Sequence, residues 1–123
     1  MILDHVGLSV TDLKASHAFY AQALAPLDIK FIKEIGGWDG FGAEDQRPEF
    51  WLGVGARPQV RMHIAFAART RDQVRQFYQA ALAAGGKENV TPCIMNIYHA
   101  NFYAAMVFDP DGNNIEAVCH APQ

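Results

Sequence analysis

Cysteine is scarce in this sequence, with only Cys93 and Cys119 in a chain of 123 residues. Two cysteines cannot form the disulfide framework with which small secreted domains supplement a small core, so we interpret both as reduced core residues. No run of 18 apolar residues is present, which argues against a membrane-spanning helix. The first ten residues include Asp4 and His5 but no basic cluster, unlike a secretory signal. We therefore expect a cytoplasmic protein with no membrane partner.

Positive charge is also scarce. Ten Lys and Arg stand against 13 Asp and Glu, giving a formal net charge of −3, and no Lys or Arg follows Lys87. Nucleic-acid-binding domains carry clustered basic residues, so we expect no nucleic-acid partner. Recognition of a ligand with several negative charges would require paired basic donors. The second half of the chain instead predicts an apolar, aromatic pocket.

Hydrophobic residues are plentiful by comparison. They make up 50% of the chain and include eight Phe and four Tyr. A chain of this length and composition can bury a core without disulfides. We expect one domain spanning residues 1–123.

An internal repeat is the most informative feature of the sequence. At a single offset of 58 residues, His5 aligns with His63, Phe19-Tyr20 with Phe77-Tyr78, and Ala23-Leu24 with Ala81-Leu82. A repeated histidine and a repeated Phe-Tyr pair in one register indicate two copies of one supersecondary unit. We place the first module at about residues 1–57 and the second at about 58–123.

Each module predicts the same order of elements. Residues 2–10 and 60–68 alternate in polarity like half-buried strands, and apolar stripes predict helices over about 11–25 and 70–84. Three shorter strands follow each helix. They are expected near 29–35, 38–43 and 49–54, and near 88–92, 102–108 and 114–119, with a turn over 109–112 and a loop over 93–101. The predicted fold is α+β: two tandem βαβββ modules, whose eight strands form a curved sheet around a cavity.

Strand parity groups three potential metal ligands. His5, His63 and Glu116 each lie on the strand face opposite the bulky apolar residues. Two imidazoles and one carboxylate form a common ligand set for divalent metals and leave positions open for water or substrate. Such a site predicts Zn, Mn, Ni or Fe as cofactor, and the metal would stabilise charge on substrate oxygens. Taken singly, each residue is more often a hydrogen-bonded structural residue.

These residues carry a family resemblance that covers essentially the whole chain. The segments LDHVGLSVTDLKASHAFY, MHIAFAA and DPDGNNIEAV resemble the glyoxalase/bleomycin-resistance/extradiol-dioxygenase group, the vicinal oxygen chelate superfamily. The resemblance implies a homodimer, in which one cavity is formed either within a chain or across two chains. In metal-using members the ligands come from the first, fourth, fifth and eighth strands. Carried over, these positions are His5, the region of Trp51, His63 and Glu116.

The fourth-strand position departs from the glyoxalase I pattern, which has a glutamate there. Alignment of PEFWLG with NNIEAV puts Trp51 at this position, as a substrate-binding residue, whereas a slipped register would supply Glu49. With Trp51 the set has three protein ligands, which lowers the expectation of glyoxalase I activity.

Four further residues are candidates for binding or catalysis. Tyr98 and His99 lie in the loop predicted before the seventh strand, and Tyr103 begins that strand beside small residues. With Glu116, His99 and Tyr103 are our catalytic candidates, since a loop histidine can act as a general acid or base near neutral pH. Tyr98 and Arg61 are candidates for substrate binding. The alternative interpretation is ordinary packing for the tyrosines and solvation for His99 and Arg61.

Two functions are compatible with these features. The first is a metal-dependent lyase or dioxygenase acting on a small oxygenated substrate that the metal chelates. The alternative is a metal-free protein that binds a drug-like or aromatic molecule in the same cavity. A complete His–His–Glu set favours the enzyme, because a binding protein has no need of it.

Overall fold

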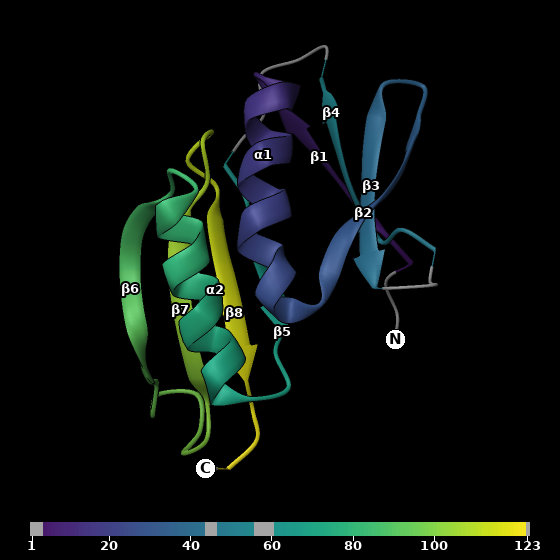
Figure 1. The fold of residues 1–123 in the computed structure, drawn as a ribbon. Coiled ribbons are helices and arrows are strands. Elements are labelled where there is room, and N and C mark those ends of the chain that lie inside the picture. Colours follow the sequence, from purple (N-terminus) through teal and green to yellow (C-terminus); the bar gives the residue numbers. More distant parts are fainter. Residues whose placement is uncertain (1–3, 44–46, 56–60, 123) are drawn as a thin grey trace.

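The computed structural model describes residues 4–43, 47–55 and 61–122 and confirms the tandem βαβββ order (Figure 1). The first module comprises β1 (Val6–Val10), α1 (Leu13–Leu24), a short 3-10 helix (Ala25–Leu27), β2 (Ile29–Ile35), β3 (Trp38–Ala43) and β4 (Phe50–Val54). The second comprises β5 (His63–Ala67), α2 (Arg71–Ala83), β6 (Lys87–Ile94), β7 (Tyr103–Phe108) and β8 (Asn114–Cys119). Residues 1–3, 44–46, 56–60 and 123 lie outside the described ranges, and with them the starts of the strands predicted over 2–10 and 60–68 and the predicted module boundary near 57–58.

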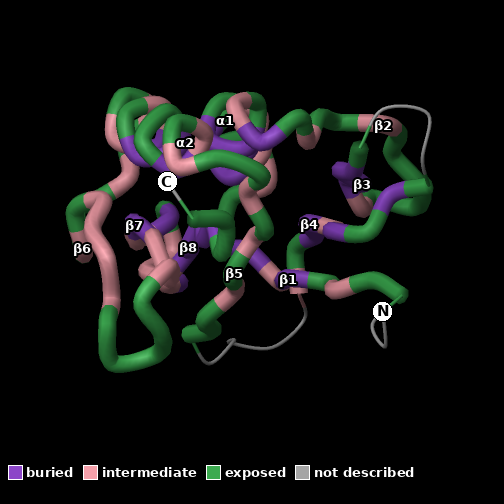
Figure 2. Tube along the Cα trace, turned by 90° about the horizontal axis from the view of Figure 1, so that it is seen from below, coloured by how far each residue is buried: buried purple, intermediate pink, exposed green. Residues whose placement is uncertain are grey.

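The strands form two four-stranded sheets of identical topology. Their orders are β1-β4-β3-β2 and β5-β8-β7-β6. In each, the first strand pairs in parallel with the last, and the other pairs are antiparallel. Viewed from below, both helices lie on one side of the strands, which follow an arc (Figure 2). The opposite face of each sheet is therefore not covered by the helices.

Each helix begins within two residues of the start predicted from the sequence and is capped by a side-chain oxygen. The side chain of Asp12 accepts a hydrogen bond from the Ala15 amide at 3.1 Å, and Thr70 Oγ1 accepts one from Gln73 at 3.1 Å. These caps satisfy amides that have no partner within the helix. Pro26 falls in the 3-10 turn that ends the first helix, and Gly85, at φ 97°, follows the second.

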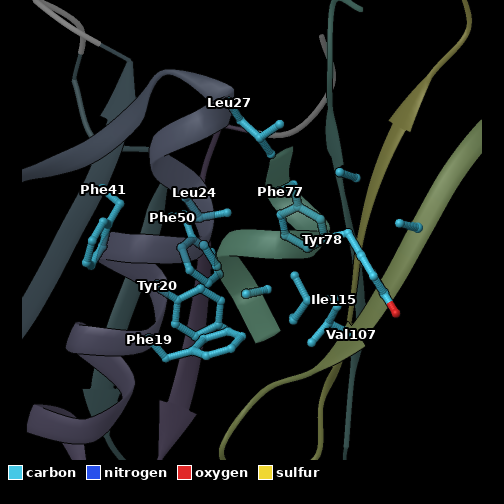
Figure 3. Close-up of a cluster of buried hydrophobic side chains, with 14 of the residues drawn as sticks. Phe19, Tyr20, Leu24, Leu27, Phe41, Phe50, Phe77, Tyr78, Val107 and Ile115 are labelled. Carbon is cyan, nitrogen blue, oxygen red and sulfur yellow. The ribbon is translucent and has the colours of Figure 1, made fainter. Parts of the chain in front are cut away.

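The repeated Phe-Tyr pairs lie at the centre of the hydrophobic core (Figure 3). Phe19 and Tyr20 of α1, with Phe77 of α2, are at most 1% exposed. The rings of Phe50 in β4 and Phe66 in β5 meet edge to face, with centroids 5.2 Å apart, so the core is continuous between the two sheets. The apolar helix stripes predicted from the repeat are confirmed.

The turn between β7 and β8 anchors α1. Gly112 donates its amide hydrogen to the Asp109 carbonyl at 2.9 Å, and Gly112 has a φ of 84°. The buried Asp109 carboxylate accepts hydrogen bonds from the amides of Asp111 and Asn113, and from the Tyr20 hydroxyl at 2.6 Å. Burial, and then the Asp109 charge, raise the pKa of Tyr20 well above its ordinary value. The first module's helix is thus held by the second module's turn.

Neither helix in the described part of the chain is long and apolar enough to cross a membrane.

Candidate metal centre

The side chains of His63 and Glu116 meet on the uncovered face of the second sheet. Glu116 pairs with Ala65 across the parallel β5–β8 ladder, so it lies beside the residue two positions after His63. His63 Nε2 is 2.9 Å from Glu116 Oε1. The histidine side chain is 50% exposed and the glutamate side chain 4%. The pair therefore joins an accessible imidazole to a buried carboxylate.

Glu116 is incompletely satisfied. Its Oε2 atom is buried and has no hydrogen-bond partner among the described residues. Burial raises the pKa of Glu116, and His63 and then His120 lower it by a smaller amount. An unpaired buried carboxylate oxygen is costly in free energy, and a bound cation is one group that would satisfy it. The donor set of this pair, one imidazole and one carboxylate, fits a divalent metal.

The pair lines a cavity of about 620 Å³. The other lining residues are mostly apolar or aromatic: Ala65, Tyr98, Phe102, Met106, Asn114, Val118 and His120. Tyr98, a predicted binding residue, lies at this cavity with its ring 4.7 Å from that of Phe102. The prediction of an apolar, aromatic pocket in the second half agrees with this lining.

His99 does not line this cavity itself, but it contacts His120, which does. Its Nε2 lies 2.8 Å from Nδ1 of His120, while its Nδ1 accepts a hydrogen bond from the Asn101 amide at 3.0 Å. In the neutral pair, His99 therefore carries its proton on Nε2 and donates it to His120, whose own proton is on Nε2. His120 is not among the candidates predicted from the sequence. It is exposed and directly follows β8, and the alternation of positions 116 and 118 continues to it, which is the signal that could have identified it.

His5 lies in a separate cavity of about 610 Å³ on the uncovered face of the first sheet. Its Nδ1 is 2.8 Å from Asp4 Oδ1, and Asp4 also pairs with Arg47 at 2.6 Å. The hydrogen bond from His5 and the charge of Arg47 hold the pKa of Asp4 below its ordinary value. Trp38 and Trp51 line the same cavity.

The strand register identifies the residue at the fourth-strand position. Gly7 pairs with Trp51 in β4, and Ala65, which lies 58 residues after Gly7, pairs with Glu116 in β8. Trp51 is therefore the first-module counterpart of Glu116. Glu49 is exposed, and its backbone pairs with Phe41 and Val6.

Within one chain, the three predicted ligands are not brought together. His5 lines the first cavity, whereas His63 and Glu116 line the second. Among the described residues, no three His, Cys, Asp or Glu side chains are grouped so that they could hold one metal ion.

Two other candidates lie away from both cavities. Arg61 lies against Gly112 of the β7–β8 turn, in a groove that Lys87 and Asp109 also line. Tyr103 packs on the helix side of its sheet, where its hydroxyl accepts a hydrogen bond from Arg75 at 3.3 Å. The small residues that follow Tyr103 are core contacts and do not line open space, because α2 packs on that face.

Comparison with known proteins agrees with this architecture. The model of the Glyoxalase/Bleomycin resistance protein/Dioxygenase superfamily matches residues 2–117. A glyoxalase/bleomycin resistance protein from Albidiferax ferrireducens is similar, with a TM-score of 0.84, 26% identity, and coverage of 99% of this chain and 100% of that one. A glyoxalase/bleomycin resistance protein/dioxygenase family enzyme from Burkholderia phytofirmans has a TM-score of 0.74 and 18% identity, with coverage of 96% and 98%.

The oxidase ChaP-H2 has a TM-score of 0.68 and 19% identity, with coverage of 99% of this chain and 94% of that one. At their low identity, this oxidase and the Burkholderia enzyme support the fold alone. A comparison with curated proteins gave no significant match.

Proposed function

Because the chain belongs to the Glyoxalase/Bleomycin resistance protein/Dioxygenase superfamily, we propose that it is a metal-dependent enzyme acting on a small oxygenated molecule. The observation that carries this proposal is the buried Glu116 carboxylate beside His63, with one oxygen left without a partner. Structural charges in a core are normally paired on both sides, whereas a metal ligand keeps an oxygen available.

The ligand set is completed by a second copy of the chain. Each chain carries two half-sites, His5 in the first-module cavity and the His63–Glu116 pair in the second-module cavity. A homodimer that places the first module of one copy against the second module of the other would unite them. A two-fold axis would then create two equivalent three-ligand sites.

When bound, a divalent metal would supply Lewis-acid stabilisation of negative charge on substrate oxygens. His63, Glu116 and the second copy's His5 would hold it. The charge of His120 lowers the pKa of Glu116. His120 can also donate a hydrogen bond to a substrate oxygen, and its hydrogen bond with His99 orients its ring. Phe102 and Met106 give the cavity part of its apolar lining.

Metal content per chain tests the proposal. Protein purified without chelator or affinity tag should contain near-stoichiometric Zn, Mn, Ni or Fe by elemental analysis. Both His63→Ala and Glu116→Ala should lose it, because each removes one of three ligands. Glu49→Gln is the matched control, since Glu49 is an exposed carboxylate of the other module, two residues from the counterpart of Glu116. Absence of metal after incubation with all four ions would refute the proposal.

A metal-free binding protein is the second candidate. It is favoured by one observation: the first module has an indole, Trp51, where the second has its carboxylate. In that case both cavities would hold an aromatic or drug-like molecule without a metal, and the metal measurement above distinguishes the two functions.

A further inference from the structure

Two tryptophans from neighbouring strands, Trp38 and Trp51, form an aromatic floor on the uncovered face of the first sheet. One row across the strands runs Gly7, Trp51, Gly40 and Lys33, and the next runs Ser9, Gly53, Trp38 and Ile35. Large and small residues thus alternate in both directions across β4 and β3. This floor, defined by Trp38 and Trp51, contains both tryptophans of the chain.

Glycines allow the indoles to lie against the sheet. A Cβ atom on Gly40 would come within 2.8 Å of the Trp51 ring, and one on Gly53 would overlap the ring of Trp38. The Trp38 ring also extends toward Gly7, where a Cβ would be 3.6 Å away. Each indole therefore lies against glycine backbone, and both indoles line the cavity.

The floor does not belong to the hydrophobic core. Trp38 and Trp51 are both only partly buried, and neither is part of the core cluster that packs under the helices. The residues of β4 that supply the core are Phe50 and Leu52, on the opposite face. Two partly exposed indoles that line a cavity offer aromatic surface for stacking.

Positive charge borders the floor. Lys33 is exposed, lines the cavity and lies in the same row as Trp51. Arg47 also lines it and pairs with Asp4. With His5 neutral, the charged lining residues sum to one excess positive charge. No Lys or Arg follows Lys87 in the sequence. In the site that the proposed dimer would form from both cavities, an anionic group would therefore pair with the basic residues of the first module.

We propose that the first-module cavity binds a planar aromatic carboxylate, with its ring stacked on Trp38 and Trp51 and its carboxylate paired with Lys33. The inference rests on the proposed function in that it names the substrate class of the same composite site. The stacking and the charge pairing use first-module residues alone, so binding of the ring requires no metal.

The two indole N–H signals in a nitrogen-15 correlation spectrum report binding directly, and Trp38→Phe and Trp51→Phe assign them. Titration of 2-naphthoate into the chelator-treated protein should shift both signals. The neutral 2-naphthylmethanol should shift them with about tenfold weaker affinity, because one charge-assisted contact is lost. Cyclohexanecarboxylate, which carries the charge without the aromatic ring, should also bind more weakly than 2-naphthoate.

Lys33→Gln should raise the dissociation constant of 2-naphthoate about tenfold and leave that of 2-naphthylmethanol unchanged. Lys30→Gln, on the same strand but outside the cavity lining, is the matched control and should change neither. Unshifted indole signals at millimolar 2-naphthoate, or equal loss in the two lysine variants, would overturn the proposal. Because the protein is metal-free throughout, failure here is separable from failure of the metal site.

Discussion

Trp51 occupies in the first module the position that Glu116 occupies in the second, since each pairs with a repeat-related residue of the adjacent parallel strand. The two modules keep one backbone plan but differ at this position. In the second module a carboxylate faces His63, and in the first an indole rests on Gly40. In our account the second module supplies two of the three metal ligands, whereas the first module supplies His5 and the aromatic floor.

Trp51→Glu should increase metal affinity. It introduces a fourth-strand carboxylate at the register position matching Glu116, so that a metal site shared by two modules would gain an anionic ligand. We expect the metal dissociation constant to fall at least about tenfold in competition with a chelator. Trp51→Gln is the control for loss of the indole. Equal affinities in the two variants would contradict placement of residue 51 at the metal.

Tyr20→Phe should destabilise the fold more than Tyr78→Phe, although the two tyrosines are repeat equivalents. Tyr20 donates its hydrogen bond to the buried Asp109, whereas Tyr78 donates to the exposed Glu88. Removing the donor from a buried charged acceptor such as Asp109 costs about 1–3 kcal/mol of stability. At an exposed acceptor such as Glu88, water replaces the lost donor. Urea unfolding of both variants measures the difference, and equal losses would contradict the anchoring role of Asp109.

Alkaline pH should weaken the fold through the same hydrogen bond, from Tyr20 to Asp109. The folded-state pKa of Tyr20 is raised above its ordinary value of 10.0, mainly by burial and also by Asp109. The native state therefore retains a proton that the unfolded chain releases, so the contribution to stability is complete below pH 10 and declines above it. Between about pH 10 and 11 the unfolding free energy of the parent should fall more steeply than that of Tyr20→Phe. Parallel profiles would show that Tyr20 titrates normally.

Removing either neighbouring histidine should raise the pKa of Glu116. His63 lowers this pKa through its charge and hydrogen bond, and His120 lowers it less, through charge alone. Carbon-13 titration of the metal-free protein should therefore show an upward shift in His120→Ala and a larger one in His63→Ala. His17→Ala is the control, because His17 pairs with Asp39 in the other module. A shift of equal size in the control would exclude a local effect.

Much of the fold could be predicted from the sequence, because local patterns mark the helices and strands of both modules: alternating polarity, apolar stripes and turn residues. The strands Ile29–Ile35, Trp38–Ala43 and Asn114–Cys119 have the predicted bounds, since turn residues border each of them. Strand β6 is longer than the predicted range 88–92, because Cys93 and Ile94 belong to it and not to the predicted loop over 93–101. It also contains Pro92, as predicted. Proline is tolerated there because β6 is the edge strand of its sheet.

The site was only partly predictable. Strand parity correctly put His63 and Glu116 on one face of the second sheet. Parity carries no information on how the two modules pack, so it could not show that His5 lies in another cavity. Parity also grouped Tyr103 with the residues that follow it on one face of β7. Which face that is depends on where α2 packs, a tertiary contact with no local signal.

Mixing two metal-free variants tests the central claim, a site shared between two copies, most directly. His5→Ala and Glu116→Ala, each binding no metal alone, would be refolded together, and the mixed dimer would be isolated through two removable tags. The account predicts that this dimer regains about half of the parent's metal per chain, because one of its two sites has all three ligands intact. A mixed dimer as free of metal as either variant alone would contradict the shared site.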